Sequence, residues 1–189
     1  GVGDINPALQ AIINNLEDDD RIDAVNTAAV GLTEWINKED ESPQANKIEA
    51  SVRILNCYLA QLEEKIAQLE DKINTHDIDD TAIELDLSQL GLKSLPPEIG
   101  KLTILEYLYL ANNQLTSIEG VEQLTNLEEL FLERNKLESL PVEIGKLTKL
   151  VRLSLYHNQL TRIPPEIGNL TKLTQLDLRI NQLTSLEGV

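Results

Sequence analysis

The sequence holds a single cysteine, Cys57, and only one tryptophan, four tyrosines and one phenylalanine among its 189 residues. One cysteine cannot form a disulfide within its own chain, which excludes a disulfide-stapled extracellular scaffold. No run approaches the roughly 20 uncharged apolar residues that a membrane-spanning helix needs. The first residues also lack the basic start and apolar block of a signal peptide. These absences predict a cytoplasmic protein with no membrane partner, although removal of a leader before Gly1 would leave secretion open.

Positive charge is scarce as well. Sixteen lysines and arginines stand against 32 aspartates and glutamates, a net charge of -16. That field repels a phosphate backbone, so we expect no nucleic-acid partner. The sequence has no glycine-rich phosphate loop and no histidine and cysteine cluster at zinc spacing. We therefore expect no enzymatic activity, no catalytic residue, no metal site and no other cofactor.

The first part of the chain has its apolar residues at helical spacing and predicts three helices. Asn6 followed by Pro7 is the sequence of a capped helix start. Residues 40–43, which contain two acidic residues, a serine and a proline, separate the second helix from a long third one at residues 43–74. We interpret residues 1–77 as a three-helix N-terminal domain.

The third helix carries an apolar stripe that steps by four and three residues without a break from position 48 to position 73. In one heptad register the a positions are mostly β-branched and the d positions mostly leucine, which favours a parallel two-stranded coiled coil. The alternative is that the stripe packs on the first two helices of the same chain. Packing within one chain is favoured overall, and residues 59–76 are the candidate segment for a homodimer.

Residues 78–189 repeat a leucine pattern about every 23 residues. Each full copy reads L-x-x-L-x-L-x-x-N-x-L, and its asparagine is Asn113, Asn135, Asn158 or Asn181. This pattern resembles the leucine-rich repeat: the 23-residue copies are similar to those of Ras-group and Roco-type proteins, and one 22-residue copy to phosphatase-regulator repeats. The resemblance implies a right-handed α/β solenoid with a parallel sheet on its concave side. We expect about five repeats, the last one incomplete, preceded by a helical bundle or coiled-coil cap.

The two ends of the repeat array depart from the pattern. Leu90 stands in the first copy where asparagine belongs, and we expect the helical part of the chain to cap that coil. The last copy stops partway with no polar capping repeat after it. The expectation there is a natural chain that continues, or a partner that covers the end. The asparagines between these ends are interpreted as a structural ladder, because an amide can satisfy backbone donors and acceptors of adjacent coils.

Alternate residues of each strand, and the two residues before each asparagine, are expected to face the concave side. Four of the aromatic residues fall at these positions, which indicates a binding surface, although aromatic residues also suit strands. Acidic residues lie in the first repeats of this face and arginines in the last ones, and such a charge gradient would orient a partner. The predicted partner-binding residues are Tyr107, Tyr109, Glu129, Phe131, Glu133, Arg134, Arg152, Tyr156, His157, Asp177 and Arg179.

The sequence thus predicts a non-enzymatic module that binds a protein partner on the concave face of a repeat solenoid. Two alternatives stay open. One is a self-assembling structural protein that uses the stripe at residues 48–73 and the open end of the solenoid. The other is the regulatory part of a larger GTPase or effector enzyme, whose catalytic domain would lie outside this chain.

Overall fold

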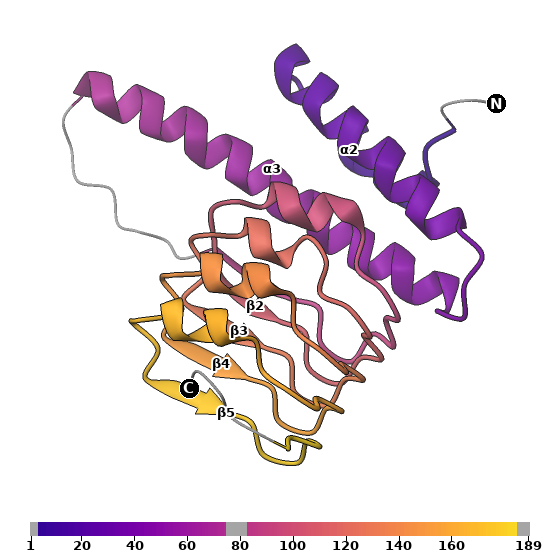
Figure 1. Cartoon of the computed structure of the whole chain (residues 1–189). Coiled ribbons are helices and arrows are strands. Elements are labelled where there is room, and N and C mark those ends of the chain that lie inside the picture. Colours follow the sequence, from indigo (N-terminus) through magenta and orange to yellow (C-terminus); the bar gives the residue numbers. More distant parts are fainter. Residues whose placement is uncertain (1–3, 75–82, 185–189) are drawn as a thin grey trace.

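A computed structural model gives the fold; it describes residues 4–74 and 83–184, with side chains for all of these except residues 64–74. Three helices come first: α1 (Pro7–Asn14), α2 (Asp19–Asn37) and α3 (Gln44–Asn74). A stack of coils follows, in which each coil is one strand and its return segment. Figure 1 shows the helices lying across the end of the stack where it begins, and the last strand at the opposite end.

Local sequence explains where the helices begin. Asn6 accepts a hydrogen bond from the backbone N–H of Ala8, and proline fills the first position of α1. Asp18 caps α2 in the same way, with two more acidic residues in the first turn. The third helix starts one residue later than predicted, because Pro43 stands before the first turn and its carbonyl accepts the N–H groups of Asn46 and Lys47.

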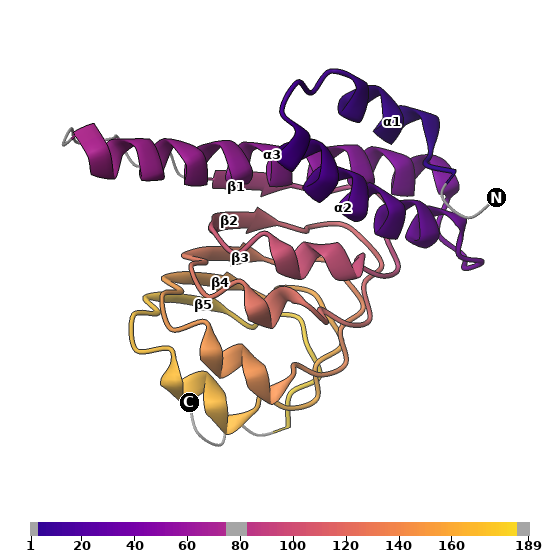
Figure 2. The same ribbon diagram turned by 90° about the horizontal axis from the view of Figure 1, so that it is seen from above.

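Five parallel strands form one sheet in sequence order, with matching positions of successive repeats in register. This confirms the predicted solenoid preceded by helices. The strands are β1 (Ile83–Asp86), β2 (Leu105–Tyr109), β3 (Glu129–Phe131), β4 (Arg152–Ser154) and β5 (Gln175–Asp177). Short 3-10 helices cover the opposite side, as Figure 2 shows: η1 (Pro97–Lys101), η2 (Val121–Gln123), η3 (Val142–Lys146) and η4 (Pro165–Asn169). The repeat leucines fill the space between strands and 3-10 helices, and most of them are fully buried.

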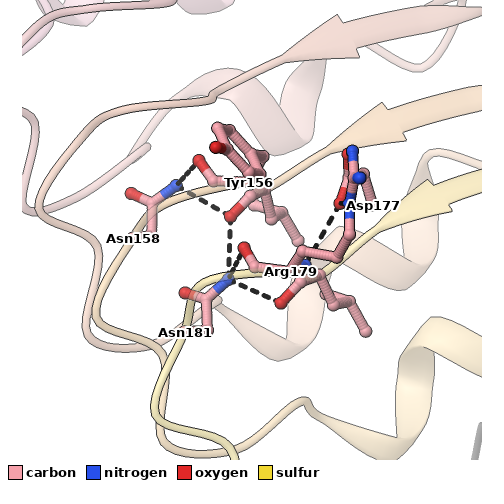
Figure 3. A network of polar contacts seen from close by, with 7 residues as sticks. Tyr156, Asn158, Asp177, Arg179 and Asn181 are labelled. Carbon is pink, nitrogen blue, oxygen red and sulfur yellow. Dashed lines mark hydrogen bonds and ion pairs between the residues drawn. The ribbon is translucent and has the colours of Figure 1, made fainter.

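Asparagine side chains join successive coils. The amide of Asn135 donates to the carbonyls of Leu110, in the coil before, and Leu132, in its own coil. Its oxygen accepts the N–H of Leu115, again in the coil before. Asn113, Asn158 and Asn181 make equivalent bonds, and Figure 3 shows the last two with their amide groups turned toward backbone carbonyls.

This arrangement accounts for the leucine in the first copy. Because each asparagine reaches back to the preceding coil, an amide at this place in the first coil would have no preceding coil to bond to. Leu90 occupies the place and is buried. The backbone of the first coil instead receives its asparagine from the second coil, since Asn113 accepts the N–H groups of Leu90 and Leu92.

Helix α3 lies along β1 and η1 and satisfies backbone groups that a preceding coil would otherwise meet. The buried side-chain amide of Gln61 donates to the carbonyl of Lys101 and accepts the N–H of Ile104. Arg53 donates to the carbonyl of Asp86. The helices and the solenoid therefore share one continuous apolar core.

The apolar stripe of α3 is used within the chain over its first part. Leu55 is fully buried, and Ile48, Val52, Leu59 and Leu62 pack against the shared core. The helix continues past β1 (Figure 2). The later positions of the predicted coiled coil, Ile66, Leu69 and Ile73, lie outside the described side chains. Across residues 4–74 and 83–184, no helix combines the length and apolar character needed to cross a membrane.

Candidate functional site

The concave face is the outward side of the five-stranded sheet, and the strand register arranges the predicted residues on it in columns. The first column holds Glu84, Tyr107, Glu129, Arg152 and Gln175, and the second holds Asp86, Tyr109, Phe131, Ser154 and Asp177. Glu133, Tyr156 and Arg179 follow two residues after the second column in their coils, and Arg134 and His157 come directly after Glu133 and Tyr156. All of them retain exposed surface.

Two aromatic rings meet at the middle of this face. The rings of Tyr109 and Phe131, on adjacent strands, lie 5.2 Å apart between centroids with their planes tilted by 34°. The Tyr109 hydroxyl donates to the Glu129 carboxylate at 3.2 Å. Partial burial, with the negative charges of Glu129 and Glu84, raises the pKa of Tyr109 to about 12. The hydrogen bond to Glu129 holds the ring of Tyr109 in place.

Glu129 connects the aromatic pair to the next strand. Its carboxylate also forms an ion pair with Arg152 at 3.1 Å. Tyr107 does not join this group, because its hydroxyl points to Glu128 at 3.5 Å, a residue outside the predicted set. The carboxylate of Glu133 has one buried oxygen with no hydrogen-bond partner among the described residues.

A second cluster surrounds Tyr156 at the later end of the face. The guanidinium carbons of Arg134 and Arg179 lie 5.7 Å and 5.4 Å from the centre of its ring, both within cation–π range. The ring of His157 meets it edge-on at 6.0 Å. Arg179 also donates to Asp177 through two nitrogens, which lowers the pKa of that carboxyl and fixes the arginine (Figure 3).

An open hollow of about 530 Å³ lies between the two clusters. Phe131 borders it on one side, and Arg152, Ser154, Gln175, Asp177 and Arg179 complete its polar rim. Three leucines also line it, and this mixture of apolar, charged and hydroxyl groups suits the side chains of a protein surface. Among the described residues, no group of three histidine, cysteine, aspartate or glutamate side chains is placed to hold a metal ion.

One residue on the edge of this face, Ile180, was placed there by its position before an asparagine but was not among the predicted partner-binding residues. The residue before each asparagine, and before Leu90 in the first copy, adopts a left-handed conformation, with φ between 54° and 60° at Gln89, Asn112, Arg134, His157 and Ile180. The first four are polar, whereas Ile180 is β-branched and 57% exposed, a rare combination with positive φ. The signal was present in the alignment of the repeats, because Ile180 is the one apolar residue in that column.

A family model described as "leucine-rich repeat region" matches residues 84–186, more than half of the chain. The chain belongs to the leucine-rich repeat family. Its 23-residue subclass, inferred above from sequence, stays a prediction. Leucine-rich repeat regions are generally non-catalytic and typically bind proteins.

Solved and curated relatives share part of this leucine-rich repeat chain. A leucine-rich repeat protein from Leptospira interrogans is 43% identical, with a TM-score of 0.50 over 51% of this chain and 25% of that one. The alpha subunits of geranylgeranyl transferase type-2 from Homo sapiens and Rattus norvegicus are each 43% identical over 54 residues. That match covers 29% of this chain and a tenth of either subunit, so it carries no transferase activity to this protein.

Proposed function

We propose that this leucine-rich repeat protein is a non-enzymatic recognition module that binds a protein partner on its concave face. The observation that carries the proposal is the partly exposed ring pair of Tyr109 and Phe131 at the centre of that face. Exposing an aromatic ring to water is unfavourable, and burying the ring in an interface removes that free-energy cost. In a chain with so few aromatic residues, placing most of them on one face favours binding over chance.

The surroundings of the ring pair support the same function. Glu129, held by Tyr109 and Arg152, and the arginines around Tyr156 form a charged margin about an aromatic centre. Central rings with a polar rim are the usual composition of a protein interface, in which few residues carry most of the affinity. The charged margin contributes to orientation and association rate.

The test is the double substitution Tyr109→Ala with Phe131→Ala. Loss of each anchor weakens binding by about 2 kcal/mol, so capture of the partner falls roughly a thousandfold. Neither ring belongs to the leucine core between the coils, and we expect the free energy of unfolding to change by less than about 1 kcal/mol. Pull-down from native extract is measured beside a thermal melt.

The matched control is Val142→Ala, an apolar side chain that is 53% exposed on the opposite side of the solenoid. It should leave capture unchanged. Full capture by the double variant, or loss of capture by Val142→Ala alone, would move the site away from the concave face.

We also propose that residues 1–77 act as the cap of the repeat array at residues 78–189. The support is Gln61, whose buried amide serves two backbone groups of the first coil. Gln61→Leu leaves both groups without partners, which costs about 2–4 kcal/mol in the free energy of unfolding. A single sharp transition, shifted as a whole, is expected in urea; two separate transitions would show that the helices and repeats are independent domains.

Self-association through α3 is a separate possibility for this chain. Only its later part could serve, because Leu55 and its neighbours already pack inward. Light scattering measures the mass of the protein in solution directly, and a monomeric mass would exclude the coiled-coil dimer.

A further inference from the structure

We infer the chemistry of the partner surface from the order of charges on the concave face. The partner presents a short extended segment with a basic side chain over β1, an apolar side chain over Tyr109 and Phe131, and a carboxylate on Arg134. The inference rests on the proposed function. It specifies the kind of segment that binds and the coil that each end of the segment contacts.

The β1 end of the face offers two carboxylates that are not paired with the nearby cation, because Arg53 bonds the backbone carbonyl of Asp86 and the carboxylate of Glu49. The side chains of Glu84 and Asp86 are exposed in neighbouring columns, and no described lysine or arginine forms an ion pair with either. Among the described residues, the Asp86 carboxylate accepts one hydrogen bond, from the backbone N–H of Ser88. A basic side chain of the partner can therefore contact both carboxylates without displacing another protein group.

On the concave face of the later coils, one arginine is left without an ion pair to a described residue. Arg152 is already paired with Glu129, and Arg179 with Asp177. Arg134 is exposed and forms no ion pair with a described carboxylate.

The ring of Tyr156 keeps the guanidinium of Arg134 in one place at 5.7 Å from its centre. A cation–π contact does not use up the N–H groups of the guanidinium, and these match the two oxygens of a carboxylate. Arg134 is therefore an anchored receptor for an acidic side chain.

Distances along the solenoid set the length of the segment. Neighbouring strands are about 4.8 Å apart, so the path from β1 to Arg134, which reaches toward the coil of β4, is roughly 10–15 Å. An extended chain advances about 3.3 Å per residue, which separates the basic and acidic residues by about three to five positions. The ring pair of β2 and β3 lies between them, and its partner is an apolar side chain. The order is basic, apolar, acidic, counted from the β1 end.

The probe for the experiment is a phage-displayed library of random peptides of about twelve residues, long enough to cross the whole face when extended. It is selected against the full chain. We expect the enriched peptides to share a basic residue and an acidic residue about three to five positions apart with an aromatic or aliphatic residue between them, in either chain direction. Their binding should fall at least about tenfold on the variant Tyr109→Ala with Phe131→Ala.

Charge reversal tests the order itself. Glu84→Lys with Asp86→Lys should weaken the enriched peptides by roughly five- to tenfold, and so should Arg134→Glu. Each loss should be recovered by reversing the charge at the matching end of the peptide, and only at that end. The matched controls are Glu138→Lys and Arg162→Glu, exposed charges away from the strands, which should change binding less than about twofold.

The outcomes separate this inference from the function beneath it. Peptides that lose binding to the ring-pair variant but share no charge order would overturn the inference and leave the concave face as the site. A library that yields no binder would likewise overturn a short linear segment as the ligand. Peptides that bind the ring-pair variant undiminished would overturn both.

Discussion

The strongest test of how the solenoid is held together is Asn135→Ala. The side chain is 6% exposed, and its amide makes three close hydrogen bonds, at 2.9 Å, 3.0 Å and 3.1 Å, with backbone groups of two coils. Alanine removes the hydrogen-bond partner of the Leu115 N–H, whereas the carbonyls of Leu110 and Leu132 each keep a bond from the neighbouring asparagine of the ladder. A buried polar group that loses its partner costs about 1–3 kcal/mol. With one group orphaned and two further bonds lost, we expect the free energy of unfolding to fall by about 2–4 kcal/mol.

Urea unfolding followed by circular dichroism measures this change, and Asn126→Ala is the control. Asn126 also bonds to two neighbours, the carbonyl of Thr103 and the amine of Lys149, but both bonds are exposed to solvent. Its loss should cost less than about 1 kcal/mol. Equal effects of the two substitutions, or a change below about 1 kcal/mol at Asn135, would refute the ladder as the source of stability.

Three further predictions follow from single side chains. Burial alone would raise the pKa of Asp40, but bonds from Lys47 and Ser42 hold the pKa below its usual value of 3.8. The ionised carboxylate therefore stabilises the fold above pH 3.8, and this stabilisation is lost as the pH falls through the lowered pKa. Asp40→Asn should lower the free energy of unfolding at pH 7 but not near pH ~2, and an equal shift of the urea midpoint at both pH values would contradict this. Ile180→Asn should raise stability by about 1 kcal/mol, because asparagine tolerates positive φ, and a lower melting temperature would contradict it. Burial raises the pKa of Cys57 to about 11, so iodoacetamide at neutral pH should label it only as the chain unfolds, and rapid labelling of the native protein would be inconsistent with that burial.

Repetition made the solenoid predictable. A leucine at each inward position appears in successive copies, so the sheet, its order and its register could be inferred without any knowledge of contacts between coils. The departure at Leu90 could be recognised as a capping signal for the same reason. What a repeat cannot predict is a position whose environment changes along the array, as the strained Ile180 shows.

Lys47 illustrates a second limit. In the sequence it is an ordinary helical lysine, yet it is 1% exposed in the structure. Its amine donates to the carbonyls of Trp35 and Lys38 at the end of α2 and pairs with Asp40 at 2.7 Å. Only the angle at which α2 and α3 meet brings these groups together, and helical periodicity carries no information about that angle.

The sequence was enough to predict which residues lie on the concave face, but not which of their side chains contact one another. Strand alternation was enough to place Tyr109 and Phe131 in one column. Side-chain rotamers decided the rest: Tyr107 turned to Glu128, while two arginines from different coils converged on Tyr156. Such choices depend on packing between coils, which a single sequence does not encode in its spacing.

Site-specific photocrosslinking tests the central claim most directly. A benzoylphenylalanine replaces Tyr107, beside the intact ring pair on the concave face, or Val142, on the opposite side of the solenoid. Both variants are irradiated in native extract, and the crosslinked species are compared with the partner recovered by pull-down. The account predicts that this partner is crosslinked from position 107 and not from position 142. Crosslinking of the partner from position 142 alone, or equally from both positions, would contradict it.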